Sequence, residues 1–295
     1  MIDGHAVFGA TGGRPHEWRR PLALFVHGAG LDHTVWALQS RWLAFHGWNV
    51  LALDLPGHGR SAGPPLPSIA ALATWLAAVI TAAVPVTAAA SSPAATPTAG
   101  PATSTAALIG HSMGSLIALE TAARFPDRVQ SLVLIGTAAA MPVHPDLLRA
   151  AAANDHAAID MVNLWGYGHS AGLGGSRVPG LWMVGAGERT LEKAQPGVLH
   201  NDLAACNAYR GGLAAAAKVA APVLLICGER DQMTPLKSGR ALAASIPGAT
   251  LVALEGAGHM LMAERPSEVL EAIAKHLAVD RTRVAGSPAA TPPLI

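Results

Sequence analysis

The chain alternates short apolar runs with glycine-rich turns and amphipathic stretches. Apolar runs of about four to eight residues between turn residues predict buried strands. They occur at residues 21–26, 48–53, 106–109, 129–135, 223–227 and 250–254, and a short strand at 6–8 also fits the pattern. Helical spacing of apolar residues follows at 33–45, 69–86, 115–124, 236–245 and 263–277. This alternation predicts an α/β fold, with a mostly parallel central sheet and helices on both faces.

One long segment, residues 137–218, interrupts the alternation. It contains helical patterns at 146–153 and 157–164 and a glycine-rich stretch at 166–180. The strand pattern resumes at Val223, so we expect an insertion and not a separate domain. Its apolar composition would suit a lid over a site at the carboxyl ends of the strands, where ligands bind in such sheets.

The expected organisation is a hydrolase-like core of residues 1–136 and 215–280, with a helical lid at 137–214. Within the core, residues 85–104 form a tract of Pro, Ala, Ser and Thr without periodicity. Such composition cannot bury enough apolar surface to fold, so we expect a disordered loop. Residues 281–295 are similar in composition and predict a disordered tail.

Composition and charge exclude several kinds of partner. The net charge is +1, and charged residues make up 13% of the chain, so we expect no nucleic-acid partner. Cys206 and Cys227 lack metal-ligand spacing, and two cysteines make no disulfide framework, which favours a reducing cytoplasm. The first residues show no basic region followed by an apolar run, so no signal peptide is expected.

Residues 69–86 carry no charge and are long enough to span a bilayer. Their larger apolar residues, however, fall on one helical stripe: Ile69, Leu72, Leu76 and Ile80. One apolar stripe is typical of a helix that packs against a core. We therefore expect no stable membrane insertion.

The strongest chemical motif is Gly110-His111-Ser112-Met113-Gly114, between a predicted strand and a predicted helix. A serine on such a tight turn projects its hydroxyl above the sheet edge. Side chains two residues to either side would collide there, which explains the glycines. The helix N-terminus behind Ser112 offers free N–H groups to the oxyanion that forms when a serine attacks an acyl carbon.

A serine nucleophile needs a base, and the base needs an orienting carboxylate. His259 lies in a glycine-rich loop after the last predicted strand, and Asp231 follows the strand at 223–227. Glu229 and Glu255 are rival acids in the same two loops, and Asp231 could instead cap a helix. The order serine, aspartate, histidine is the one that this architecture requires.

The glycine-rich turn at residues 27–30 follows the strand at 21–26. Such a turn lets a backbone amide face the substrate oxygen, so the expected oxyanion donors are the N–H groups of Ala29 and Met113. His27 and His111 stand beside glycines within their motifs. We expect both to stabilise their turns by hydrogen bonds and not to act as bases.

Taken together, the motifs resemble those of the α/β-hydrolase superfamily, of the lid-bearing serine hydrolase type, over about residues 21–278. The motifs are His27-Gly28-x-Gly30, Asp54-x-Pro56-Gly57-His58-Gly59-x-Ser61, Gly110-His111-Ser112-Met113-Gly114, Gly228-Glu229-x-Asp231 and Gly258-His259. The resemblance implies a Ser112 nucleophile, a His259 base and an Asp231 acid. It also implies a structural Asp54 and oxyanion amides at Ala29 and Met113, whereas Ser115 departs from the glycine of many members.

The expected function is hydrolysis of carboxylic esters through an acyl-enzyme on Ser112, without metal or organic cofactor. The apolar lid favours a small-molecule ester of a small-to-medium apolar acid or alcohol. Substrate-binding residues are expected at Gly28, Trp165, Met161 and Trp182. A homodimer is also compatible with the sequence.

The same machinery supports other reactions. It could cleave carbon–carbon bonds of dienone acids, whose carboxylate Arg177 or Arg189 could meet, or it could transfer acyl groups. Relatives that release halide or open epoxides use a carboxylate nucleophile, and Ser112 argues against them. A ligand-binding protein without catalysis is a remoter alternative, since such proteins usually lose a residue of the triad.

Overall fold

The computed structural model describes residues 1–17, 20–83, 105–176, 178 and 180–281. The expected disordered loop at 85–104 lies outside these ranges. So does the expected tail, except for its first residue, Arg281, which ends the last helix instead.

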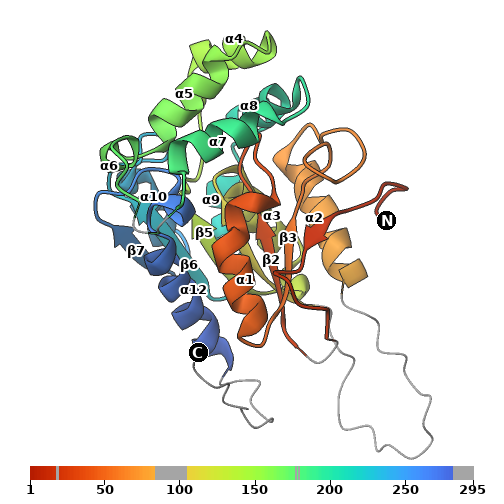
Figure 1. Ribbon diagram of the computed structural model, residues 1–295. Helices are drawn as coiled ribbons and strands as arrows, with labels where there is room; N and C mark the ends of the chain where they lie inside the picture. The colour runs from red at the N-terminus through yellow and green to blue at the C-terminus, as the bar shows by residue number, and fades with distance from the viewer. Residues whose placement is uncertain (18–19, 84–104, 177, 179, 282–295) are drawn as a thin grey trace, which may run out of the picture.

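A seven-stranded sheet forms the centre of the molecule, in the order β1-β3-β2-β4-β5-β6-β7 (Figure 1). The strands are β1 (Gly9–Ala10), β2 (Leu22–Val26), β3 (Asn49–Leu53), β4 (Ala106–His111), β5 (Val129–Ile135), β6 (Val223–Gly228) and β7 (Thr250–Leu254). Strand β1 pairs antiparallel with β3, and all other neighbours are parallel. The predicted mostly parallel sheet is confirmed, although the N-terminal strand lies at 9–10 and not at 6–8.

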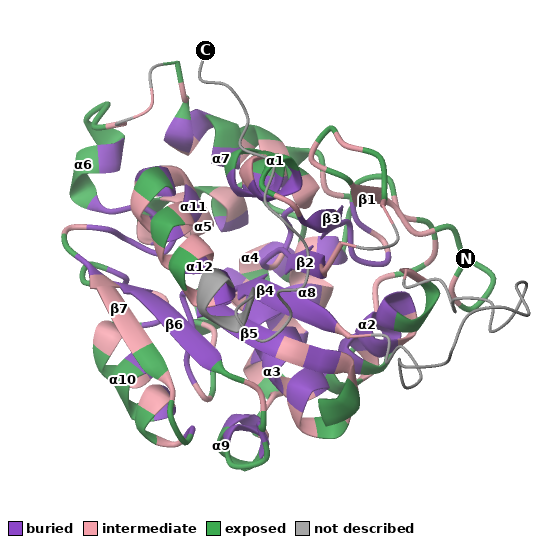
Figure 2. Cartoon of the chain, turned by 90° about the horizontal axis from the view of Figure 1, so that it is seen from below, coloured by how far each residue is buried: buried purple, intermediate pink, exposed green. Residues whose placement is uncertain are grey.

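The strands send alternate side chains into two separate cores. In β2, Leu24 faces the core formed with α2 (Ile69–Ala83), α3 (Met113–Arg124), α9 (Gly212–Ala216) and α10 (Leu236–Ala244). Phe25 faces the core formed with α1 (Ala37–Phe45) and α12 (Pro266–Arg281). Figure 2 shows the buried strands between these two helical layers. Burial on both faces explains why inner strands such as β2 and β6 are continuously apolar.

Helix α2 packs its apolar stripe into the core, as the spacing predicts. Ile69, Leu72, Leu76 and Ile80 are each at most 2% exposed. Among the residues that the structure describes, no helix is long and apolar enough to cross a membrane.

Two expected helices are each divided in two. The first, at 33–45, begins as a 3-10 turn, His33–Trp36, before α1. The second, at 263–277, consists of α11 (Leu261–Glu264) and α12, which starts at Pro266. A proline disfavours helical backbone at the preceding residue, and Arg265 accordingly has φ −133° and ψ 54°.

The insertion between β5 and β6 forms a helical group at one end of the sheet (Figure 1). Its helices are α4 (Pro145–Ala152), α5 (Ala157–Gly166), α6 (His169–Gly172), α7 (Met183–Glu192) and α8 (Val198–Ala208). The Gly166 carbonyl, at the end of α5, accepts the N–H groups of His259 and Met260. The inserted helices thus contact the loops that follow the strands.

Candidate active site

Ser112 lies on a sharp turn between β4 and α3, with φ 53° and ψ −120°. A positive φ is uncommon for a residue with a side chain and stores backbone strain. The Ser112 N–H donates to the Ile135 carbonyl at 2.9 Å, which ties the turn to the end of β5. The strained strand-to-helix turn predicted from the motif is therefore present.

The two flanking glycines are required by close backbone approach. A Cβ at Gly110 would lie 2.2 Å from the Gly114 carbonyl oxygen, and a Cβ at Gly114 would lie 2.2 Å from the Val26 carbonyl oxygen. Neither position has room for a side chain, as the motif predicts. The Ser115 hydroxyl donates to the Ser112 carbonyl at 2.6 Å and lies 2.8 Å from Thr137 Oγ1. Ser115, where many family members have glycine, therefore stabilises the turn by hydrogen bonds.

His259 and Asp231 form a buried pair, with Nδ1 of the imidazole 2.8 Å from Oδ2 of the carboxylate. The other carboxylate oxygen accepts the N–H groups of Met233 and Thr234. Burial alone would raise the Asp231 pKa, but the charge and hydrogen bond of His259, with the bonds from Thr234, outweigh burial and lower it. Asp231 thus stays ionised beside the imidazole, while its second oxygen orders the loop.

The rival acids lie elsewhere. Glu229 and Glu255 are both exposed, whereas Asp231 is 5% exposed. The structure therefore brings Asp231 to His259 and leaves the two glutamates at the surface.

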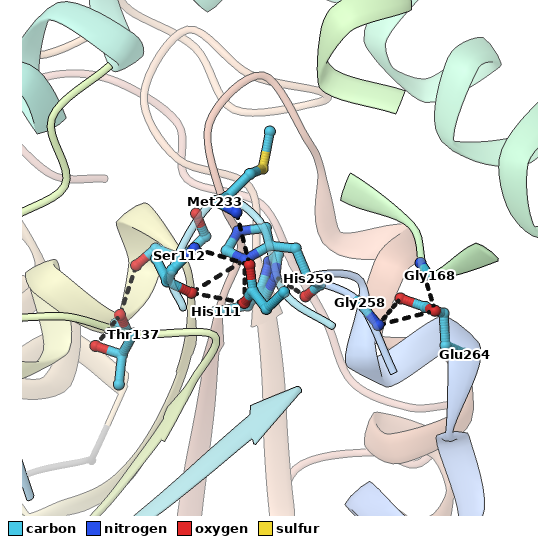
Figure 3. A network of polar contacts seen from close by, with 11 residues as sticks. His111, Ser112, Thr137, Gly168, Met233, Gly258, His259 and Glu264 are labelled. Carbon is cyan, nitrogen blue, oxygen red and sulfur yellow. Dashed lines mark hydrogen bonds and ion pairs between the residues drawn. The ribbon is translucent and has the colours of Figure 1, made fainter. Parts of the chain in front are cut away.

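Ser112 and His259 lie close together at the ends of the strands (Figure 3). Gly136 follows the residue that binds the Ser112 N–H, and a Cβ there would lie 3.1 Å from Nδ1 of His259. His111 Nε2 donates to the His259 carbonyl at 2.9 Å, so the residue before the serine also holds the histidine loop. Nucleophile, base and acid candidates from three loops therefore meet in one place.

The turn at residues 27–30 presents an amide to the same place. The Gly28 carbonyl accepts from His27 Nδ1 at 2.8 Å and from the Leu31 N–H at 3.2 Å. Because C=O and N–H of a trans peptide point in opposite directions, the Ala29 N–H is directed away from these donors. Among the described residues, neither this N–H nor that of Met113 has an acceptor. Both amides are free to bind an oxyanion.

His27 is neutral and stabilises this turn through hydrogen bonds at both ring nitrogens. Its Nε2 accepts the Leu55 N–H at 3.1 Å, while its Nδ1 donates to Gly28. Burial, together with the charge of nearby His58, lowers the His27 pKa to about 3. Because His27 is neutral and hydrogen-bonded at both nitrogens, it stabilises the turn and does not act as a base, as the sequence predicts.

Of the four expected substrate-binding residues, Gly28 lies at this place, and two others pack in a cluster that Ala29 also contacts. Gly28 lies against Ser112, with a would-be Cβ 3.2 Å from the serine Cβ. Met161 and Trp165 belong to an apolar cluster of α4, α5 and α8 that Ala29 also contacts. The fourth, Trp182, is placed differently.

Trp182 is 64% exposed and lines a separate hollow with Leu38 and Met260, between α1 and α7. None of Ser112, Asp231 or His259 lines that hollow. Trp182 stands just before α7 and its ring covers Gly185 one turn on, which a sequence cannot reveal. The expectation that it contacts substrate is therefore not supported by its position.

Two groups of histidine and carboxylate side chains are close enough to hold a metal ion: Asp32, His33 and Asp54, and His156, Glu188 and Glu192. In the first, Asp54 already accepts the N–H groups of His33 and Arg60, which is the structural role expected of it. Neither group includes a residue of the Ser112 site.

One polar residue beside the turn at residues 27–30, Asp202, could not be predicted from the sequence. Asp202, in the middle of α8, is 1% exposed, and its carboxylate binds both the Gly30 N–H and the His58 imidazole. The only signal in the sequence is a lone acid among Leu and Ala at helical spacing. Such an acid is usually solvent-exposed, so the contact could not be foreseen.

Comparison with known proteins gives the family of the chain. A family model described as the alpha/beta hydrolase family matches residues 23–272. The pimeloyl-[acyl-carrier protein] methyl ester esterase of Chromobacterium violaceum is 31% identical, covering 87% of this chain and 94% of the relative. The corresponding esterase of Aromatoleum aromaticum is 30% identical, covering 84% and 95%.

Solved structures show the same fold at lower identity. The enol-lactonase of Burkholderia xenovorans superposes with a TM-score of 0.74 at 23% identity, covering 94% of this chain and 98% of that one. A thermophilic esterase of Thermogutta terrifontis gives 0.73 at 22% identity, covering 94% and 93%. The family and the named relatives identify an enzyme of the esterase type. The chain belongs to the α/β hydrolase family.

Proposed function

We propose that this protein is a serine esterase, with Ser112 as nucleophile, His259 as base and Asp231 as the acid that orients it. The observation that carries the proposal is the buried 2.8 Å contact between His259 and Asp231, next to a serine in strained backbone. Asp231 accepts from Nδ1, so the other imidazole nitrogen, Nε2, is left to take the serine proton.

The reaction proceeds in two steps. Ser112 Oγ attacks the acyl carbon while His259 accepts its proton, and the Ala29 and Met113 amides bind the tetrahedral oxyanion. His259 then protonates the departing alcohol, which leaves an acyl-enzyme. Water, deprotonated by His259, attacks the acyl carbon and releases the acid, and Ser112 recovers its proton.

The surroundings favour an apolar substrate. Met161 and Trp165 share an apolar cluster with Ala29. An acyl or alcohol group bound at the turn of residues 27–30 would therefore contact apolar side chains. We propose esters of small-to-medium apolar acids or alcohols, with the inserted helices as a lid over them. The relatives named as methyl ester esterases support a small alcohol as leaving group.

Two arginines of the inserted helices are paired with acids: Arg149 with Asp146, and Arg189 with Glu188 and Glu192. Arg189 is therefore unsuited to hold the carboxylate of a dienone acid, and Arg177 lies outside the described residues.

Hydrolysis of p-nitrophenyl esters from acetate to laurate, by wild type and Ser112→Ala, tests this function. We expect a rate that peaks at one chain length and disappears in the variant. Absence of turnover on every ester would contradict the proposal and favour carbon–carbon hydrolysis or acyl transfer. Acyl transfer is recognised by a transfer product when a competing alcohol is added.

A further inference from the structure

Asp202 connects the inserted helices to the oxyanion turn. Its Oδ2 atom accepts the Gly30 N–H at 2.9 Å and lies 2.7 Å from Nε2 of His58. Each of the two side chains in the Asp202–His58 pair is 2% exposed. One buried oxygen of α8 therefore holds both the turn after β2 and the turn after β3.

The hydrogen-bond partners of His58 favour an ion pair at this contact. Its Nδ1 lies 3.0 Å from the Pro56 carbonyl, which can only accept, so Nδ1 carries a proton. Its Nε2 faces a carboxylate oxygen that already accepts from Gly30, so Nε2 donates as well. An imidazole that donates from both nitrogens is positively charged.

The charges around His58 agree with this state. Burial opposes its charge, but the hydrogen bond and charge of Asp202, the Pro56 carbonyl and the charge of Asp54 outweigh burial and raise its pKa. His27, with its ring centroid 4.9 Å from that of His58, is held neutral and so adds no like charge. The charged groups around His58 therefore stabilise its protonated form.

The position of Gly30 explains what the pair controls. Its N–H belongs to the peptide that follows Ala29, whose own N–H is the proposed oxyanion donor. Leu199 of α8 and Leu191 of α7 pack on the same residue, since a Cβ at Gly30 would lie 2.9 and 3.0 Å from them. Holding the Gly30 N–H therefore sets the plane of the peptide next to the donor.

We propose that Asp202 is a positioning residue for the oxyanion hole, which fixes the Ala29–Gly30 peptide from α8 and is itself held by protonated His58. The inference rests on the proposed function, because it assigns the Ala29 amide to the oxyanion. It makes the inserted helices part of the catalytic geometry as well as a cover. Oxyanion donors act only in the transition state, so misplacing one lowers kcat and leaves substrate binding intact.

The test compares Asp202→Ala and Asp202→Asn with Asn207→Ala, on the best ester of the p-nitrophenyl series. Asn207 is a matched control, since its side-chain oxygen also ties α8 to a neighbouring segment, by accepting the Val143 N–H at 3.0 Å, and makes no hydrogen bond to Asp202 or Gly30. A trifluoromethyl ketone serves as probe, because Ser112 adds to its carbonyl carbon and the oxygen becomes an oxyanion. Circular dichroism and thermal melting establish which variants fold.

For Asp202→Ala we expect kcat to fall about 10²-fold, the lower end of the effect of losing an oxyanion donor, with an unchanged KM. Affinity for the ketone should fall by the same factor. Asp202→Asn keeps the size of the side chain and an acceptor, so a smaller loss in kcat is expected, and this variant decides if the alanine variant does not fold. Asn207→Ala should stay near wild type.

The inference is overturned if a folded Asp202 variant keeps the wild-type kcat, or if the loss lies in KM alone. It is equally overturned if Asn207→Ala loses as much activity, because α8 would then act only as a general support. Failure of the proposed function looks different: the wild type itself would not hydrolyse esters, or Ser112→Ala would remain active.

Discussion

Ser112 and its neighbour His111 are both held in states that cost free energy, one in its backbone and one in an unpaired ring nitrogen. Ser112 keeps a positive φ, and His111 donates to the His259 carbonyl while its Nδ1 has no hydrogen-bond partner among the described residues. Burial and the nearby His259 lower the His111 pKa to about 3, so it stays neutral. Strain and an unpaired polar atom persist only where surrounding contacts fix them, which is typical of functional sites.

Replacing Asp231 by Asn should remove the charge that orients and stabilises the His259 imidazolium while preserving the shape of the loop. We expect kcat to fall by about 10⁴-fold on the same ester, as when the aspartate of a Ser-His-Asp triad is replaced by asparagine. Glu229→Gln is the matched control, because Glu229 is an exposed acid of the same loop. Equal losses in the two variants would contradict the assignment of Asp231.

The charge on His58 makes stability depend on pH. Because its pKa is raised in the folded protein, its contribution is complete below the unfolded value of about 6.5 and is lost as pH rises through the folded value. Asp202, Asp54 and His27 are the titratable groups that face it. Urea denaturation at about pH 6 and about pH 9 should therefore show a larger fall in the free energy of unfolding for wild type than for His58→Gln.

His169→Gln, which replaces an exposed histidine, should keep the wild-type dependence on pH. If wild type and His58→Gln lose the same free energy of unfolding between the two pH values, His58 is not charged in the folded protein.

At the scale of elements, the strands could be predicted and the contacts of the inserted helices could not. Strands β5 and β7 have the predicted bounds, because each is a short, mostly apolar segment bounded by turn residues. The turn at Ser112 was equally predictable, because five adjacent residues, 110–114, specify it. The exposure of Trp182 was not, because its ring covers Gly185 instead of facing the sheet.

The two tryptophans of the inserted helices should therefore differ in their effect on substrate choice. Trp165 lies in the apolar cluster that reaches Ala29, so Trp165→Ala should enlarge the space there and shift the preferred acyl chain to greater length. Trp182→Ala should leave the chain-length profile unchanged, because Trp182 lines a separate hollow. The measurement is kcat/KM across the p-nitrophenyl series, and a shift produced by Trp182→Ala alone would contradict this account.

For the whole molecule, the parallel sheet brings together residues that are far apart in the chain. Asp231 and His259 could be paired from sequence because each follows a strand, and the carboxyl ends of parallel strands share one edge. The bond between His58 and Asp202, which are 144 positions apart, could not, because Asp202 lies in a helix whose orientation depends on packing. Motifs predict the nucleophile, base and acid, whereas the support from α8 is visible only in three dimensions.

The central claim is that Ser112, activated by His259, forms a covalent bond with an acyl group. Its most direct test is intact-protein and peptide mass spectrometry after reaction with a fluorophosphonate probe, in which serine oxygen displaces fluoride from phosphorus. The account predicts one added probe, located on Ser112, absent in Ser112→Ala and strongly slowed in His259→Ala. Labelling that persists in Ser112→Ala, or a wild-type enzyme that hydrolyses esters without being labelled at Ser112, would contradict it.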